Sequence, residues 1–216
     1  MADDEEIPQP LWEGPFDESG KPHGQGKLTW PPPPMGEDDD EEKPPDVYEG
    51  TMEHGVRQGK GTYTWSNGST YTGEYKEGKK SGQGKMKFPD KGVYEGEWQD
   101  DQPHGSGTYT YPNGDVYQGG FQAGKRHGKG MYHYKAPCAQ LVGDWSEGAF
   151  AYGRWVFRDG SMFMGKFGAD GQPNSQPDAG SYYFAGSGLT QEGHTAKDGA
   201  WVAHADPVVG QPFTMA

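Results

Sequence analysis

Aromatic residues and glycines alternate with polar residues along most of the chain, and the pattern returns every 23 residues. In the unit that begins at Tyr94, these residues are Tyr94, Gly96 and Trp98, followed by Gly107, Tyr109 and Tyr111. Residues two apart lie on the same face of a β-strand. The pattern therefore predicts two strands in each unit, with rings and glycines on one face and polar residues on the other.

Turn residues separate the expected strands and join one unit to the next. Asp, Pro, His and Gly lie between the two strands of the unit that begins at Tyr94, and Asn113-Gly114 leads into the next unit at Tyr117. Asn-Gly favours a tight hairpin turn because both residues tolerate positive φ. Each unit is therefore expected to be a β-hairpin, and the chain an all-β array of antiparallel hairpins.

Glycines inside the strands need a physical reason, because glycine weakens a strand. We expect each of them to leave a gap in which a neighbouring ring lies flat. Rings must also supply the core, since aliphatic residues are scarce and the chain has 37 Gly, 13 Tyr, 9 Phe and 7 Trp. The residues expected to form this framework and the partner surface are Tyr48, Gly50, Tyr63, Trp65, Tyr71, Gly73, Tyr75, Tyr94, Gly96, Trp98, Tyr109, Tyr111, Tyr117, Gly119, Phe121, Tyr132 and Trp145.

The repeated sequence, Tyr-x-Gly-x-aromatic followed by Gly-x-x-His-Gly-x-Gly, an aromatic pair and Asn/Asp-Gly, resembles the MORN repeat (membrane occupation and recognition nexus). The resemblance covers roughly residues 12–184, with departures at Met52, Asp101 and Leu141. It implies that the hairpins form one elongated, twisted, single-layer sheet. Such a sheet cannot cover its own aromatic face, and an exposed apolar face of that size implies a partner.

The repeat divides the chain into six segments. They are a disordered acidic N-terminus (1–11), an outlying first MORN-like hairpin (12–30), a Pro-rich acidic disordered insert (31–47), four regular MORN repeats (48–140), degenerate MORN-like repeats (141–184) and an irregular C-terminal tail (185–216). The insert contains six consecutive acids, Glu37, Asp38, Asp39, Asp40, Glu41 and Glu42, whose repulsion opposes regular structure. It is either a solvated loop or a charged segment that meets a basic or moving partner.

The net charge of −13 lies mostly at the N-terminal end, where residues 1–47 hold 14 acidic and 3 basic residues. Nucleic-acid binding is not expected, because it needs a concentrated basic surface. One basic cluster lies in the repeats and consists of Lys76, Lys79, Lys80, Lys85, Lys87 and Lys91. It is either an exposed edge that discourages aggregation, or a contact for an anionic partner, a phosphoinositide headgroup or the acidic insert.

No motif in the sequence points to catalysis, a metal ion or a cofactor. The segment Gly82-Gln-Gly84 lacks the Ser or Thr and the helix that follow in a phosphate-binding loop. His23, His104 and His127 recur at one turn position, so repetition explains them better than metal ligation does. The single cysteine, Cys138, is expected to be a plain thiol and fits a reducing compartment.

The N-terminus is acidic, whereas a secretion signal is basic and then apolar, and no apolar run approaches the ~20 residues of a membrane span. The protein is therefore expected in the cytosol, or attached to something in the cytosol.

Within the MORN proteins, the small size, acidic character, repeat coverage and poorly repetitive tail are similar to a radial spoke head subunit of cilia and flagella. The resemblance implies a non-catalytic structural subunit of the axoneme. Its partners would be other radial spoke head proteins, with transient contact to central-pair projections, and it would help central-pair signals regulate dynein-driven motility. The alternative left open is a membrane- or phosphoinositide-associated scaffold that uses Lys76–Lys91.

Overall fold

The structure is a computed structural model that describes residues 9–32, 43–136, 139–168, 171–173, 180–196, 201–204 and 206–209. The chain divides into two units, Met1–Gln102 and Pro103–Ala216. Within the described ranges the structure contains strands and turns but no helix. The all-β prediction is therefore confirmed.

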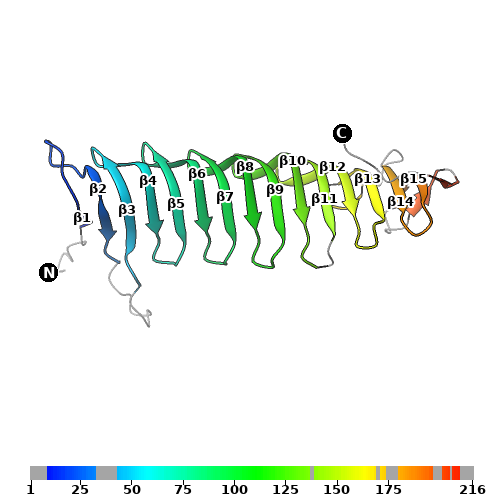
Figure 1. Cartoon of the computed structure of the whole chain (residues 1–216), viewed down its shortest axis with the longest axis horizontal. Coiled ribbons are helices and arrows are strands. Elements are labelled where there is room, and N and C mark those ends of the chain that lie inside the picture. Colours follow the sequence, from blue (N-terminus) through cyan, green and yellow to red (C-terminus); the bar gives the residue numbers. More distant parts are fainter. Residues whose placement is uncertain are drawn as a thin grey trace, which may run out of the picture. The chain divides into compact units, whose positions relative to one another are not determined.

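The first unit is a row of antiparallel strands in sequence order (Figure 1). They are β1 (Leu11–Glu13), β2 (Gly24–Trp30), β3 (Asp46–Glu53), β4 (Val56–Thr64), β5 (Thr70–Lys76), β6 (Lys79–Lys87) and β7 (Val93–Gln99). Each strand pairs with the next, and the register sets glycine opposite glycine, as in Gly50 with Gly61 and Gly73 with Gly84. The prediction of antiparallel hairpins is confirmed here.

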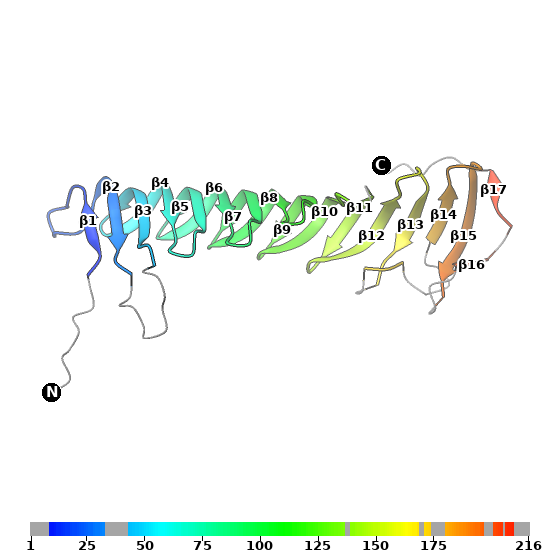
Figure 2. The ribbon, with the colours of Figure 1, turned by 90° about the horizontal axis from the view of Figure 1, so that it is seen from below.

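The second unit continues in the same manner. Its strands are β8 (Gln102–Thr110), β9 (Val116–Gln122), β10 (Lys125–His133), β11 (Gln140–Ser146), β12 (Ala149–Val156), β13 (Met162–Lys166), β14 (Gly180–Phe184), β15 (Leu189–Thr195), β16 (Trp201–Ala203) and β17 (Val208–Val209). Neighbouring strands from β8 to β16 are antiparallel, and β17 pairs with β15 (Figure 2).

One tyrosine forms the centre of each of the four regular repeats. We call these residues the inner tyrosines: Tyr48, Tyr71, Tyr94 and Tyr117. All four are fully buried. The ring of Tyr71 fills the space beside the paired glycines Gly73 and Gly84. A Cβ atom added to Gly73 would lie 2.5 Å from the Tyr71 hydroxyl, and a Cβ atom added to Gly84 would lie 2.4 Å from the same hydroxyl. The hydroxyl donates a hydrogen bond to the Glu74 carbonyl at 3.0 Å. The expectation that rings lie over strand glycines is confirmed.

A second set of rings, four residues after the inner tyrosines, closes the core from the sides. Tyr71 meets Tyr75 and Trp98 edge-on, with both pairs of ring centroids 5.2 Å apart. Tyr75 and Trp98 keep only 4% and 5% of their surface exposed. In the second unit, Phe121 and Trp145 surround Tyr117 in the same way. Burial raises the pKa of Tyr117 to about 12, so this phenol is neutral at physiological pH.

This packing corrects the expectation of an uncovered aromatic face. A single layer of strands does bury these rings, because each ring lies flat against glycine backbone and is covered by the rings of neighbouring repeats. Edge-to-face pairs at this spacing are favourable in addition to the area they bury. The inner tyrosines and their side rings are therefore a core, and they offer no open surface to a partner.

The expected irregular tail, 185–216, contains strands where it is described. β15 pairs with β14 and β16, and a Cβ on Gly193 would lie 2.6 Å from the Trp201 ring. A ring over a strand glycine thus recurs after the 23-residue period has ended. The expectation of an irregular tail rested on the loss of the 23-residue period, and that loss hid these strands.

Candidate interaction surface

A row of rings lies on the later strand of each hairpin or directly after it, and we call it the aromatic ladder; all of its rings except Tyr63 are partly exposed. Its members are Trp30, Tyr63 and Trp65 in the first unit, and Tyr109, Tyr111, Tyr132, Tyr134, Trp155, Phe157, Tyr182 and Phe184 in the second. Successive rings touch: Tyr63 lies 4.5 Å from Trp65, and Tyr111 lies 5.4 Å from Tyr132, between ring centroids. Unlike the core rings, most of these keep part of their surface open to solvent.

Hydrogen bonds from tyrosine hydroxyls to aspartates hold two of the ladder rings in place. Tyr63 donates its hydroxyl hydrogen to Asp46 at 2.9 Å, and Tyr132 donates to Asp115 at 2.8 Å. Asp115 also accepts from the Lys135 amide at 2.9 Å. Burial by itself would raise the pKa of Asp115, but these hydrogen bonds and that from Asn113 outweigh burial and lower it. The ladder is therefore presented by anchored rings, which lose little entropy on binding.

Arginine or lysine side chains at one repeat position make cation–π contacts with the rings. Arg57 and Lys80 occupy this position in the first unit, and Arg126 occupies it in the second. The Arg57 guanidinium lies 5.3 Å from the Tyr63 ring centre and donates to the Gly78 carbonyl at 2.8 Å. The Lys80 ammonium lies 4.9 Å from the Trp98 ring centre. Burial lowers the pKa of Lys80, and Asp101 acts in the opposite direction.

Arg126 makes the most contacts of these cations. Its guanidinium carbon lies 4.4 Å from the Trp145 ring centre, and its nitrogens donate to the Gly148 carbonyl at 2.6 and 3.1 Å. A third nitrogen donates to the Tyr111 hydroxyl at 3.2 Å.

The Arg126 side chain borders a hollow of about 340 Å³. The hollow is lined by Arg126, Tyr132, Tyr134, Leu141, Trp145, Gly148, Ala149, Phe150 and Gly171. An aromatic hollow with one fixed cation suits a peptide side chain or turn with an acidic or carbonyl group.

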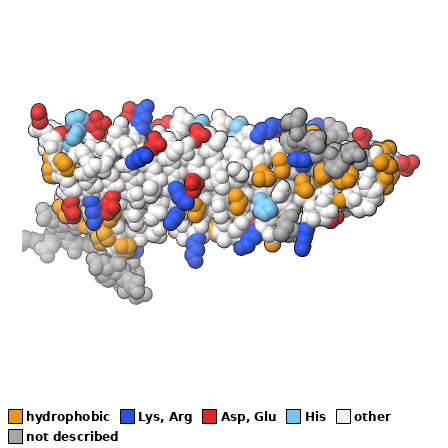
Figure 3. Space-filling model, viewed as in Figure 1, with side chains coloured by type: hydrophobic (Ala, Val, Ile, Leu, Met, Phe, Trp, Pro, Cys, Tyr) orange, Lys and Arg blue, Asp and Glu red, His pale blue; other side chains and the backbone are white. Residues whose placement is uncertain are grey.

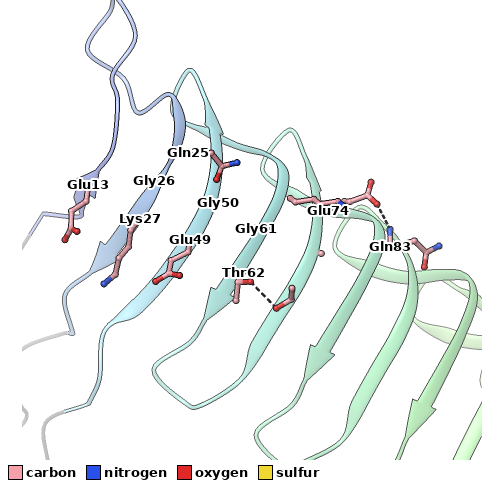
Figure 4. A pocket seen from close by; sticks show the side chains of 13 residues that line it. Glu13, Gln25, Gly26, Lys27, Glu49, Gly50, Gly61, Thr62, Glu74 and Gln83 are labelled. Carbon is pink, nitrogen blue, oxygen red and sulfur yellow. Dashed lines mark hydrogen bonds between the residues drawn. The ribbon is translucent and has the colours of Figure 1, made fainter.

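The polar face of the first unit carries a wider trough of about 790 Å³ (Figure 4). Glycine backbone forms its floor, and side chains such as Glu49, Thr62 and Glu74 project from successive strands along it. Acidic and basic residues face each other on neighbouring strands. In the strand register, Lys27 lies opposite Glu49 and Lys60 lies opposite Glu74. This mixture of charges does not select one class of ligand.

The lysine cluster does not form one basic patch. Lys79 makes an ion pair with Asp100 at 3.0 Å, and Lys85 makes one with Glu95 at 2.9 Å. Lys80 packs on core rings, while Lys76 and Lys87 are exposed. On the face that Figure 3 draws, acidic side chains lie among basic ones. The arrangement favours a solvated edge over a contact for an anionic surface.

Several residues of this surface were not predicted from the sequence, and others lie outside what the structure describes. Arg57, Arg126 and Trp155 escaped notice, although the 23-residue period places Arg57 and Arg126 at one repeat position and could have found them. The acidic segment from Glu37 to Glu42 and the thiol of Cys138 lie outside the described residues.

The repeat also matches a known family. The MORN repeat family matches residues 18–32, 48–70, 71–93, 94–116 and 117–135. The chain contains five MORN repeats. Each of the four later MORN repeats begins at an inner tyrosine, and the stacked cations Arg57, Lys80 and Arg126 share one position in them. MORN repeats form a scaffold type of protein and are not a catalytic fold.

A comparison with solved structures found matches of low similarity. The TCP domain of SAS-4 (dCPAP) of Drosophila melanogaster, in complex with a proline-rich motif of Ana2, is 11% identical, with a TM-score of 0.43 over 68% of this chain and 85% of that chain. The TCP10 domain of Danio rerio CPAP is 11% identical, with a TM-score of 0.36 over 88% of this chain and 92% of that chain. A comparison with curated proteins found no match.

In the ranges that the structure describes, no helix is long and apolar enough to cross a membrane.

Proposed function

We propose that this protein is a non-catalytic scaffold whose MORN repeats hold partner proteins on the aromatic ladder. The observation that carries the proposal is the contrast between the two sets of rings. The inner tyrosines are fully buried, whereas ladder rings such as Tyr111 and Tyr134 keep exposed surface beside Arg126. Tyrosine, tryptophan and arginine are the residues that most often carry the binding energy of protein interfaces.

We further propose that the scaffold is a subunit of the radial spoke head in the axoneme of cilia and flagella. Support comes from the acidic N-terminal region, the extent of the repeats and the weakly repetitive tail, a combination most like radial spoke protein 10. Other radial spoke head proteins are then its partners in one complex. Its place in the cell is the cytoskeleton of the cilium, where it helps central-pair signals reach dynein.

Fractionation of ciliated cells that express a tagged copy tests this proposal. We expect the protein to remain with axonemes after detergent extraction and to be released by high salt in a large particle, together with spoke head proteins identified by mass spectrometry. Loss of the protein with the detergent-soluble membranes contradicts the axonemal proposal and favours the membrane-associated alternative. In that case Lys76, Lys87 and Lys91, which are exposed, are the first residues to replace.

Two variants locate the partner surface in the same experiment. Tyr134→Ser removes a ladder ring from the hollow beside Arg126, and we expect the released particle to lose partners or to form at a several-fold lower yield. Tyr152→Ser replaces an exposed tyrosine that does not belong to the ladder, and this control should assemble normally. Equal behaviour of the two variants contradicts a partner site on the ladder.

The acidic segment from Glu37 to Glu42 is proposed to make a weak electrostatic contact with a moving partner. Repulsive or transient contacts of this kind allow sliding, whereas tight binding would stall it. Deletion of residues 36–43 is expected to alter ciliary beating and to reduce its dependence on ionic strength, because exposed charges act through screened forces. Unchanged beating with unchanged salt dependence leaves the segment as a solvated loop.

A further inference from the structure

Three metal-ligating side chains meet at one end of the first unit. Asp17 lies in the loop between β1 and β2, His23 directly precedes β2, and His54 lies in the turn between β3 and β4. One ligand atom from each residue lies within 4.8 Å of the other two. Asp17 Oδ2 is 2.7 Å from His54 Nδ1, and the two imidazole centroids are 5.1 Å apart. Two imidazoles and one carboxylate at this spacing form a ligand set that zinc uses.

Repetition explains only part of this cluster. The residue before the second-strand glycine faces the turn of the next hairpin in every repeat, as Gln58 shows by accepting a hydrogen bond from the Glu77 amide at 2.9 Å. The corresponding pairs are His23 with His54, Gln58 with Glu77, Ser81 with Asp100, His104 with Ala123, and His127 with Glu147. The first pair alone consists of two histidines. Asp17 then adds a third ligand from a loop outside the repeat pattern.

Hydrogen bonds within its own loop orient the Asp17 carboxylate so that one oxygen points to His54. Asp17 Oδ1 accepts hydrogen bonds from the Ser19 amide at 2.9 Å, the Ser19 hydroxyl at 2.7 Å and the Lys21 amide at 2.9 Å. Oδ1 is thereby occupied, and Oδ2 is turned towards His54. The side chain of His54 is 67% exposed, so water has access to the cluster.

We propose that Asp17, His23 and His54 bind one divalent transition-metal ion, with zinc as the first choice. Imidazole nitrogen and carboxylate oxygen are suitable ligands for it, and water supplies the fourth position. The ion replaces the hydrogen bond between His54 Nδ1 and Asp17 Oδ2, and the neutral imidazole then carries its one proton on Nε2. The ion joins residues 37 positions apart in the sequence and fastens the outlying first hairpin to the β3–β4 turn.

Calorimetric titration of the full chain with zinc chloride tests the proposal. A second histidine pair, His194 and His204, has its facing nitrogens 2.8 Å apart, so the reference protein carries alanine at both positions. We expect this reference to bind one equivalent of zinc. His54→Ala and His23→Gln should each weaken binding by at least about tenfold, the lower end of what loss of even an outer-shell partner causes. His127→Gln, at the position that corresponds to His23, should leave binding unchanged.

These variants are chosen so that folding is preserved. Ala123 holds the turn position equivalent to His54, and their φ values are 48° and 50°, so alanine fits this conformation. Gln58 already occupies the position equivalent to His23. Cobalt(II) provides a second readout, since its visible absorption on binding should be lost in His54→Ala and kept in His127→Gln. The proposal is overturned if the reference binds no zinc, or if His54→Ala and His23→Gln bind zinc as tightly as the reference does.

Discussion

Replacing Gly84 with alanine is expected to destabilise the first unit by about 3 kcal/mol, the upper part of the range for overpacking a tight core. A Cβ at this position would lie 2.4 to 2.6 Å from three atoms of the Tyr71 ring and hydroxyl. Tyr71 has no exposed surface, and Tyr75 and Trp98 stand against its sides. The ring therefore has no free direction in which to move.

A second substitution separates this clash from a general effect of alanine. Tyr71→Leu removes the hydroxyl and the ring atoms that the new Cβ would meet. In that background we expect Gly84→Ala to cost less than about 1 kcal/mol, because alanine is intrinsically better than glycine within a strand. Gly73→Ala should gain no such relief. A Cβ on Gly73 also meets backbone, the Gly84 Cα at 2.6 Å and the Gln83 carbonyl at 2.7 Å.

Urea unfolding of the four proteins, followed by tryptophan fluorescence, measures this double-mutant cycle. A coupling of about 2 kcal/mol between Gly84→Ala and Tyr71→Leu supports the account of ring packing. If Gly84→Ala costs the same in both backgrounds, the glycine is needed for another reason, such as strand curvature. In that event the ring-over-glycine contact is not what fixes the sequence pattern.

The sequence predicted the parts of this fold that each repeat determines by itself. Alternation and turn residues identified the strands, and the spacing of Tyr71, Gly73 and Tyr75 placed three positions on one face. Covering the core rings, however, depends on contacts between repeats, such as that of Tyr71 with Trp98. No pattern within a single repeat reports how closely the next repeat approaches. The expectation of an open aromatic face was therefore wrong for the inner tyrosines, while ladder rings such as Tyr109 and Tyr111 are partly exposed.

The candidate sites show the same division. The ladder rings Tyr109 and Tyr111 were found because they obey the period, but the hollow beside Arg126 combines residues from β10, β11 and the turn before β12. Asp17 and His54 belong to different segments and meet only in the folded chain. Residues that act together across segments leave no local spacing to detect. Their meeting in space was therefore accessible only from the structure, although the period marks the position of Arg126.

Replacing Arg126 with alanine is expected to destabilise the second unit by about 2–3 kcal/mol, since it leaves a part-buried acceptor without its guanidinium donors and removes a cation from desolvated rings. The Gly148 carbonyl loses both of its guanidinium donors, and the Trp145 ring loses the cation 4.4 Å from its centre. Arg126→Lys should recover only part of the loss, because an ammonium cannot bind the carbonyl and the Tyr111 hydroxyl as a planar fork does.

The neighbouring Lys125 is a matched control, because it carries the same charge on the same strand. Its ion pair with Glu147 is short, at 2.7 Å, but the side chains of both residues are more than half exposed. Exposed pairs contribute about 0–1 kcal/mol, so Lys125→Ala should scarcely change the urea midpoint. If the two alanine variants lose equal stability, net charge and not stacking is the contribution of Arg126. If only Arg126→Ala is destabilised, the cation belongs to the framework that holds the ladder rings in place for a partner.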